Sequence, residues 1–307
     1  WTIAWSFMPT HLVWFRADLR VHDNIALAAA CRAKDANVLA LFMATPEQWR
    51  QHDMAPRQAA LLRAYLNDLQ HSLAGKGIPL LYKEVSDFAA QLQTLQEICK
   101  QHDVRHLFYN YQYEFNEQQR DRQLENVLEG VVCEGFDDSV MLAPGSVMTG
   151  NHEMYKVFTP FKNAFIKRLK EALPECVAAP AARGEPVTDL PELTFDYPQQ
   201  AFDETLFPAD EKAAIAQLRQ FCKQNAADYE ARRDFPGVEG TSRLSACLAL
   251  GAISPRQCLH RLLAEQPQAL DGGAGAVWLN ELIWREFYRH LMTYHPDLCK
   301  HRPFIRW

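Results

Sequence analysis

Short apolar runs and helical segments alternate along the first half of the chain, and this order constrains the fold more than any other feature. Five runs have the length and composition of buried strands: residues 11–15, 38–42, 80–83, 106–109 and 131–134. Four segments with helical spacing lie between them: residues 24–32, 56–73, 88–101 and 116–128. Strict alternation favours a parallel sheet with helices on both faces. We therefore predict a doubly wound, Rossmann-like α/β domain over residues 8–143.

The chain after residue 143 has a different pattern. We assign residues 144–208 to an interdomain connector, which contains a basic helix at 162–170 and then six prolines between 174 and 208 with little periodicity. From 209 to 307 the pattern is helical and no strand is indicated. This predicts an all-α domain, and we expect that domain to be incomplete at residue 307.

Composition narrows the class of protein. The chain has 307 residues, 48% hydrophobic and 23% charged, and no apolar run approaches the ~20 residues of a membrane helix. Its eight cysteines are scattered without a Cys-x-x-Cys pair, and its histidines lack metal-ligand spacing. These features indicate reduced thiols in the cytoplasm, with no disulfide framework and no metal site. The net charge of −6 argues against a protein that coats nucleic acid non-specifically.

The loop after the first predicted strand excludes one common ligand. Residues 16–20 read Arg-Ala-Asp-Leu-Arg, and no Gly-x-Gly-x-x-Gly follows the strand. Those glycines let the backbone approach the pyrophosphate of a nicotinamide dinucleotide. A nicotinamide-binding domain is therefore not expected.

A helix predicted over residues 278–288 says most about function. At 3.6 residues per turn, Trp278, Glu281, Arg285 and Tyr288 share one face, with Trp284 at its edge. The opposite stripe is apolar and is expected to face the core: Leu279, Leu282, Ile283 and Phe287. Indoles, a carboxylate and a guanidinium suit stacking on a ring and hydrogen bonding to a ring edge or a phosphate. The alternative is a tryptophan-rich core face whose Glu and Arg pair.

A second segment, residues 240–245, carries four hydrogen-bonding side chains after a glycine. At a helix start, such a cluster can offer backbone N–H groups, hydroxyls and a guanidinium to a phosphate. A simple Ser or Thr helix N-cap is the alternative.

Three segments together resemble the DNA photolyase/cryptochrome family. They are residues 11–24, His-Leu-Val-Trp-Phe-Arg-Ala-Asp-Leu-Arg-Val-His-Asp-Asn, residues 239–245, Glu-Gly-Thr-Ser-Arg-Leu-Ser, and residues 278–288, Trp-Leu-Asn-Glu-Leu-Ile-Trp-Arg-Glu-Phe-Tyr. The resemblance runs from residue 8 to residue 307 and is nearest to bacterial cyclobutane pyrimidine dimer photolyases of the folate-antenna class. Residues 1–7 lie outside it, and we interpret them as upstream read-through or a tag. We expect the chain to be a C-terminally truncated fragment.

The resemblance implies ligand contacts at matching positions. The FAD contacts are Tyr229, Thr241, Ser242, Arg243, Leu244, Ser245, Trp278, Glu281 and Arg285. Contacts to damaged DNA are Glu281, Trp284, Arg285 and Tyr288, with Glu281 hydrogen-bonding the damaged pyrimidine and Trp284 packing against the flipped-out dimer. The antenna, 5,10-methenyltetrahydrofolate, is expected at Asn116, Glu117, Cys299 and Lys300. For Asn116 and Glu117, a helix N-cap followed by a first-turn acid is the alternative.

The implied activity is that of a deoxyribodipyrimidine photo-lyase, a light-driven enzyme that splits pyrimidine dimers with an electron from reduced FAD. The resemblance also implies a cytoplasmic monomer that binds damaged DNA without a membrane or an obligate protein partner. Further flavin contacts of the family are not found within residues 1–307, so we expect this polypeptide to be inactive. Two other functions remain open: a cryptochrome-type blue-light photoreceptor without repair activity, and an inert fragment with an intact first domain.

Overall fold

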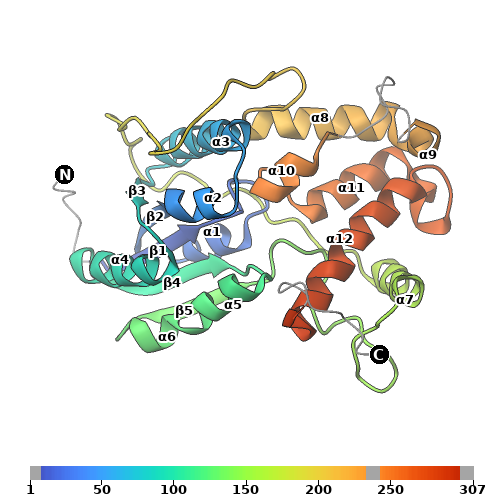
Figure 1. Cartoon of the computed structure of the whole chain (residues 1–307), viewed down its shortest axis with the longest axis horizontal. Helices are drawn as coiled ribbons and strands as arrows, with labels where there is room; N and C mark the ends of the chain where they lie inside the picture. The colour runs from blue at the N-terminus through green and yellow to red at the C-terminus, as the bar shows by residue number, and fades with distance from the viewer. Residues whose placement is uncertain (1–7, 233–242, 298–307) are drawn as a thin grey trace.

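A five-stranded parallel sheet organises the first half of the chain (Figure 1). The structure, a computed structural model, describes residues 8–232 and 243–297. The strands are β1 (Thr10–Phe15), β2 (Asn37–Ala44), β3 (Leu80–Glu84), β4 (Val104–Asn110) and β5 (Val132–Phe136). They pair in the order β3-β2-β1-β4-β5. All five predicted strands are confirmed to within a few residues at each end.

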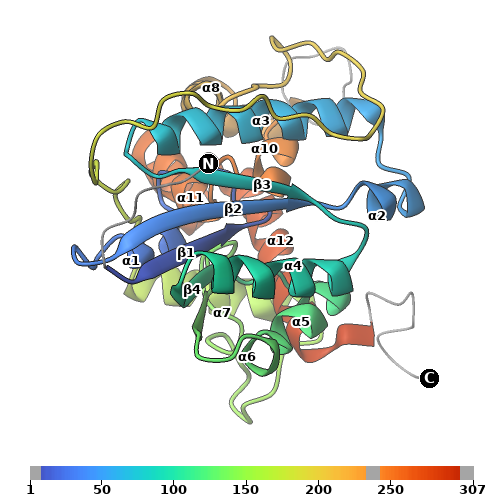
Figure 2. The same cartoon turned by 90° about the vertical axis from the view of Figure 1, so that its left-hand side faces the viewer.

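Helices cover both faces of this sheet, as the alternation predicted (Figure 2). Because successive strand residues point to opposite faces, Val13 and Phe15 of β1 share a core with α1 (Ile25–Ala30) and α3 (Pro56–Ala74). Leu12 and Trp14 share the other core with α4 (Phe88–Gln101) and α6 (Leu124–Val127). Burial on both faces explains why β1 and β2 are nearly continuous apolar runs, whereas the edge strands β3 and β5 are partly exposed.

Two helical features of this domain differ from the prediction. The single helix expected over residues 116–128 is two helices, α5 (Phe115–Arg122) and α6, separated at Gln123. The short helix α2 (Pro46–Gln51) was not predicted. Six residues make fewer than two turns, so an apolar period cannot be recognised in α2.

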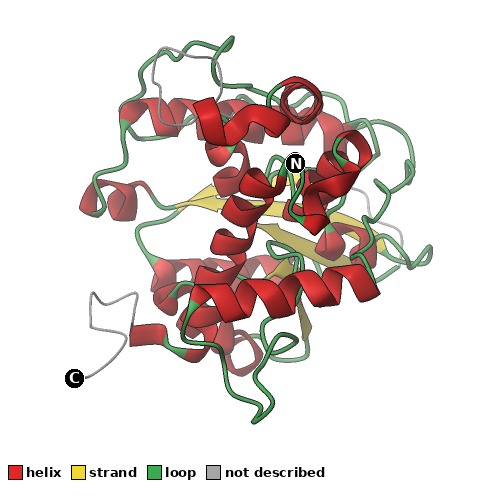
Figure 3. Cartoon of the chain, turned by 90° about the vertical axis from the view of Figure 1, so that its right-hand side faces the viewer, coloured by secondary structure: helices red, strands yellow, loops and turns green. Residues whose placement is uncertain are grey.

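Every element described after β5 is helical, which confirms the change of class along the chain (Figure 3). The elements are α7 (Phe158–Glu171), α8 (Glu211–Gln224), η1 (Ala226–Asp228), α9 (Tyr229–Arg232), α10 (Ser245–Leu250), α11 (Pro255–Glu265), η2 (Pro267–Asp271) and α12 (Ala276–Tyr294). Helix α7 begins before the predicted residue 162, because Pro160 lies in its first turn, where a missing N–H costs nothing. The domain boundaries themselves stay a prediction.

The proline-rich segment 174–208 has no regular element and lies against α3. Arg63 Nε of α3 donates to the Leu193 carbonyl at 2.8 Å, and Tyr65 Oη donates to the Pro208 carbonyl. Hydrogen bonds from side chains of α3 to backbone carbonyls thus fix this segment on the surface of the α/β domain.

A buried ionic cluster joins the sheet to the helical elements, and we name it the Asp23 cluster: Arg20, Asp23, Asp138, Ser254 and Arg256. Its members are at most 3% exposed. Arg256 Nε of α11 donates to Asp23 Oδ2 at 3.0 Å, and Arg256 Nη2 donates to Asp138 Oδ1 at 3.0 Å. Arg20 pairs with Asp138, and Ser254 donates to Asp23. Charged groups far apart in the sequence thus set how α11 sits on the loops that follow β1 and β5.

Candidate functional site

Helix α12 presents a polar and aromatic surface along only part of its length. The stripe predicted to face the core is buried, which confirms that part of the prediction. Glu281 and Tyr288 are exposed, but Trp278 is only 3% exposed. Its indole packs edge-on against Phe221 of α8, with ring centroids 4.8 Å apart. The four predicted residues therefore do not share one exposed face, because Phe221 of α8 covers Trp278 in the first turn of α12. The contact of Trp278 with FAD stays a prediction.

Trp284 is the most prominent group on the uncovered part of α12. Its side chain is 37% exposed, and one face of the indole stacks on Phe158 of α7, with centroids 3.7 Å apart and planes 10° apart. Tyr288, 54% exposed, lies 5.7 Å from Trp284 with planes 27° apart. We name Glu281, Trp284 and Tyr288 the α12 aromatic surface. It offers an open π surface beside a carboxylate.

Arg285 lies away from this surface, against the α/β domain. Its Nη1 donates to the Ser139 carbonyl at 2.8 Å. Burial, reinforced by the nearby Arg289, lowers the pKa of Arg285 to about 10, so the guanidinium remains charged at neutral pH. Arg285 and Arg289 line a small polar cavity of about 60 Å³ together with Asn110 and Tyr113.

Two buried groups of α12, Glu286 and His290, were missed by the sequence analysis. Glu286 Oε1 accepts from the Met141 N–H at 2.6 Å, and His290 Nε2 lies 2.9 Å from the Leu142 carbonyl oxygen. With Arg285, they hold the segment that follows β5. The available signal was that both polar residues fall on the predicted core stripe at i, i+4 spacing, where an ordinary surface residue is not expected.

The residues predicted to contact FAD gather only in part. Tyr229 and Trp278 both pack edge-on against Phe221, a residue that the sequence analysis missed. Arg243 and Ser245 are exposed at the start of α10, and Leu244 is buried. The N-cap of α10 is Leu244 and makes no side-chain cap hydrogen bond, so Ser245 is not the serine cap of the alternative interpretation. Thr241 and Ser242 lie outside the described residues.

A second candidate site is a cavity of about 480 Å³ at the carboxyl ends of β1, β2 and β4. Strand order reverses between β1 and β4, the place where open α/β sheets bind ligands. We name it the sheet-edge pocket. Much of its lining is apolar: Phe42, Met43, Trp49, Met54, Leu62, Phe88 and Leu250. Most of the rest of the lining is polar or charged, including Arg16, Glu117 and Arg120. A cavity of this size with both apolar and polar walls suits a small planar ligand that has a polar edge.

Glu117 is the predicted antenna residue that lines the sheet-edge pocket. Burial raises the pKa of its carboxyl group. Asn116 is exposed, and the N-cap of α5 is Glu114, so the helix-cap interpretation of Asn116 was wrong. The two other predicted antenna residues, Cys299 and Lys300, lie outside the described residues.

The floor of the sheet-edge pocket is rigid because its two arginines are bound from several sides. Arg16 donates to both carboxylate oxygens of Asp121, at 2.6 and 2.9 Å. Arg120 Nη2 donates to Gln112 Oε1 at 2.6 Å, and burial lowers the pKa of Arg120 to about 10. Each guanidinium carbon lies within 5 Å of the Trp14 ring centroid, at 4.8 Å for Arg16 and 4.7 Å for Arg120.

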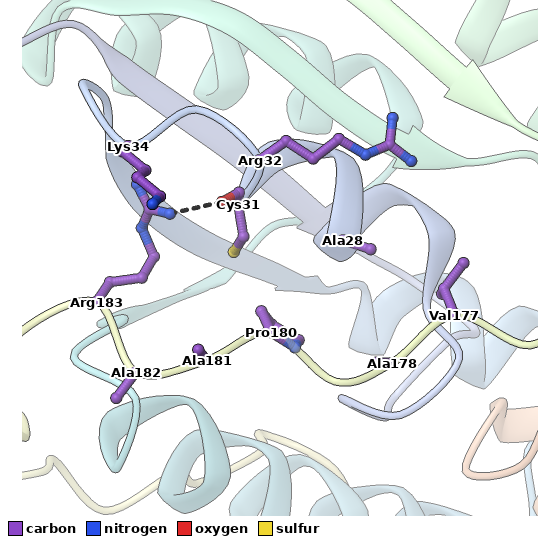
Figure 4. A pocket seen from close by; sticks show the side chains of 10 residues that line it. All are labelled: Ala28, Cys31, Arg32, Lys34, Val177, Ala178, Pro180, Ala181, Ala182 and Arg183. Carbon is purple, nitrogen blue, oxygen red and sulfur yellow. Dashed lines mark hydrogen bonds between the residues drawn. The ribbon is translucent and has the colours of Figure 1, made fainter.

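A third hollow, of about 570 Å³, lies between the end of α1 and residues 177–183 of the connector (Figure 4). Arg183 crosses it and donates to the carbonyls of Cys31, Ala33 and Ala36, each at 2.7 Å. Its guanidinium therefore serves to fasten the connector. Much of the remaining lining is alanine, so this hollow offers less chemistry than the other two sites.

Among residues 8–232 and 243–297, no three His, Cys, Asp or Glu side chains are grouped as metal ligands would be. No described helix combines the length and apolar character needed to cross a membrane.

Comparison with known proteins gives a consistent result. The family model for DNA photolyase matches residues 11–180. The deoxyribodipyrimidine photo-lyase of Salmonella typhimurium is 70% identical over 302 residues, which cover 98% of this chain and 64% of that protein. The enzyme of the same name from Escherichia coli is 68% identical over 301 residues, with the same coverage of 98% and 64%. This chain therefore spans about 64% of the length of these relatives.

Among solved structures, a cryptochrome from Synechocystis sp. PCC6803 superposes with a TM-score of 0.81 at 25% identity. The match covers 95% of this chain and 63% of that one. The arrangement of the sheet, the connector and the helical elements is thus shared with that protein.

Proposed function

Because this chain belongs to the DNA photolyase family, we propose that it serves light-driven repair of cyclobutane pyrimidine dimers, with FAD as the cofactor. The observation that carries the proposal is the exposed, pre-stacked indole of Trp284 beside Glu281 on α12. A dimer cannot be reached inside a duplex, so it must be extruded, and an extruded base needs an aromatic wall and polar groups at its edge. Trp284 supplies the wall, and the Glu281 carboxylate accepts a hydrogen bond from the pyrimidine.

Some of the residues assigned to FAD contacts lie where they could hold the cofactor. Tyr229 and Trp278 both contact Phe221, and Ser245 is exposed at the start of α10, where the first N–H groups have no partner within the helix. We assign Arg243, Leu244 and Ser245 to the phosphate side and Trp278 to the packing beneath the flavin. When bound, reduced FAD supplies the excited-state electron that opens the cyclobutane ring and takes it back afterwards.

We infer that the sheet-edge pocket, or its rim, holds the antenna. Its apolar lining and the Glu117 carboxyl suit the flat ring and the N–H edge of a pterin, as in 5,10-methenyltetrahydrofolate. We also propose that the protein acts as a cytoplasmic monomer, with damaged DNA as its partner and no obligate protein partner.

The test of the repair proposal uses this chain extended by the part of the Salmonella typhimurium relative that it does not span. We expect Trp284→Ala to weaken binding to dimer-containing DNA by about 1–3 kcal/mol, the scale of one lost base–aromatic stack, with flavin content retained. Gel-shift titration with damaged and undamaged duplexes measures the difference. Tyr294→Ala, which removes another exposed aromatic ring of α12, is the matched control and should leave discrimination unchanged.

The same measurement separates repair from photoreception. A flavin-loaded protein that responds to blue light but neither discriminates nor repairs dimers would be a cryptochrome-type photoreceptor, and the repair proposal would be wrong. Equal discrimination by Trp284→Ala and the parent would remove Trp284 from the lesion site.

The antenna assignment predicts that a substitution at Glu117 reduces folate binding but does not abolish repair. We expect Glu117→Ala to lower folate occupancy, seen as reduced near-UV absorbance of the purified extended chain, because the pocket loses its hydrogen-bond acceptor for the pterin. Repair driven by direct excitation of the flavin should survive. Glu114→Ala, which removes an exposed acid three residues earlier, is the control. Undiminished folate binding in Glu117→Ala would exclude Glu117 from the antenna site.

A further inference from the structure

Phe158 is the one aromatic side chain of α7 that stacks on Trp284 among the described residues. It is the first residue of α7, and its ring lies face to face with the indole at 3.7 Å and 10°. A parallel ring at this distance covers much of one face of the indole. Phe287 and Tyr288 also contact the indole, with ring centroids at 5.8 and 5.7 Å, and the 37% exposure of Trp284 is what these three rings leave uncovered.

Phe158 is itself held in place from the core. Its ring meets Phe287 of α12 at 5.8 Å and 65°. Phe287 in turn packs on the fully buried Phe161 at 5.0 Å. The start of α7 is thus anchored on α12 by aromatic contacts that run from Phe158 through Phe287 to the buried Phe161.

We propose that Phe158 is a positioning residue, which holds the Trp284 indole in one orientation and leaves its outer face open for the lesion. This inference rests on the repair function proposed above. An exposed tryptophan without such a partner samples several rotamers. A ligand that stacks on that tryptophan binds more weakly, because binding must restrict the side chain to one rotamer at a cost in entropy. With Phe158 in place, that ordering is already present before DNA binds.

The orientation can be tested on residues 1–307 without flavin or DNA. In protein labelled with 5-fluorotryptophan, the fluorine resonance of Trp284 is assigned from its absence in Trp284→Phe. We expect Phe158→Leu to shift and broaden this resonance, because the ring-current field of Phe158 is lost and the indole becomes mobile. Phe158→Tyr, which retains a ring, should preserve it.

Phe165→Leu is the matched control for lost packing within α7. Phe165 is buried and meets Phe161 and His290 but makes no described ring contact with Trp284. The Trp284 resonance should stay in place in this variant. An unchanged Trp284 resonance in Phe158→Leu would overturn the proposal without touching the repair function.

Lesion binding by the extended chain provides the second test. Phe158→Leu should reduce discrimination for dimer-containing DNA about two- to tenfold, the range expected for one aromatic pair, and Phe158→Tyr should restore it. Loss of discrimination in Trp284→Ala but not in Phe158→Leu would refute the positioning role alone. Tighter binding by Phe158→Leu would show that Phe158 blocks the indole, which also refutes it.

Discussion

Replacing Arg256 with methionine is expected to lower the free energy of unfolding by about 3–5 kcal/mol, the range for breaking a buried ion pair from one side. Arg256 makes five hydrogen bonds to the Asp23 cluster and its loops. They run to Asp23 Oδ2, the Asp23 carbonyl, Asp138 Oδ1, the Asp138 carbonyl and the Val140 carbonyl. Methionine fills much of the volume but donates nothing, so two buried carboxylates lose part of their compensation.

Urea denaturation measures this difference through the midpoint and the slope of the transition. Arg261→Met is the matched control, because Arg261 lies on the same helix but is partly exposed. It forms an i, i+4 pair with Glu265 at 3.6 Å. Such a pair contributes about 1 kcal/mol or less. If both variants lost the same stability, the Asp23 cluster would not be what holds α11 on the α/β domain.

The sheet was predictable because its physical signal is local. The inner strands β1 and β2 are buried on both faces, so each is an apolar run that is visible in the sequence without knowledge of its neighbours. Helix α3 carries an apolar period over 19 residues, which is equally visible. Helix α2 is too short to show an apolar period. The break between α5 and α6 at Gln123 could not be predicted either, because no proline or glycine marks it in the sequence.

The Asp23 cluster was not predictable, because its signal is not local. Asp23, Asp138 and Arg256 come from three distant segments, and each alone is of a type that usually faces solvent. Only the fold brings them together and excludes water. The sequence motif at residues 11–24 includes Asp23, but nothing in that motif indicates that Asp23 pairs with Arg256.

In the candidate site, too, features with a local signal were predictable, and features that depend on contacts between helices were not. Periodicity correctly placed Glu281 and Tyr288 on the surface and the stripe of Leu279, Leu282 and Ile283 in the core. Periodicity failed at Trp278, because the cover over a helix comes from another element, here Phe221 of α8. The stack of Phe158 on Trp284 likewise joins two helices and has no counterpart in the local sequence.

The polypeptide of residues 1–307 is expected to purify without stoichiometric FAD, whereas the extended chain should carry roughly one flavin per molecule. A small-molecule site buries most of its ligand, about 70–90% of the surface. Within the described residues, the assigned FAD positions offer at most one wall: Arg243, Ser245 and Glu281 are exposed, and Trp278 is buried against Phe221. The photo-lyase relatives are longer than this chain, which spans about 64% of their length.

Both polypeptides are purified in excess FAD and passed over a desalting column. The flavin absorbance per mole of protein then measures how much FAD each polypeptide retains. Dissociation from a one-walled site is fast, so the flavin should be lost from residues 1–307 on the column and retained by the extended chain. The extended chain with Trp278→Ala is the control for the packing beneath the flavin, and it should retain less than its parent. A yellow preparation of residues 1–307 with one flavin per chain would show that the groups around Phe221 and α10 suffice to hold the cofactor. In that case the exposed positions on α12 would have to close over the ligand, and Glu281 would become protected from solvent when FAD binds.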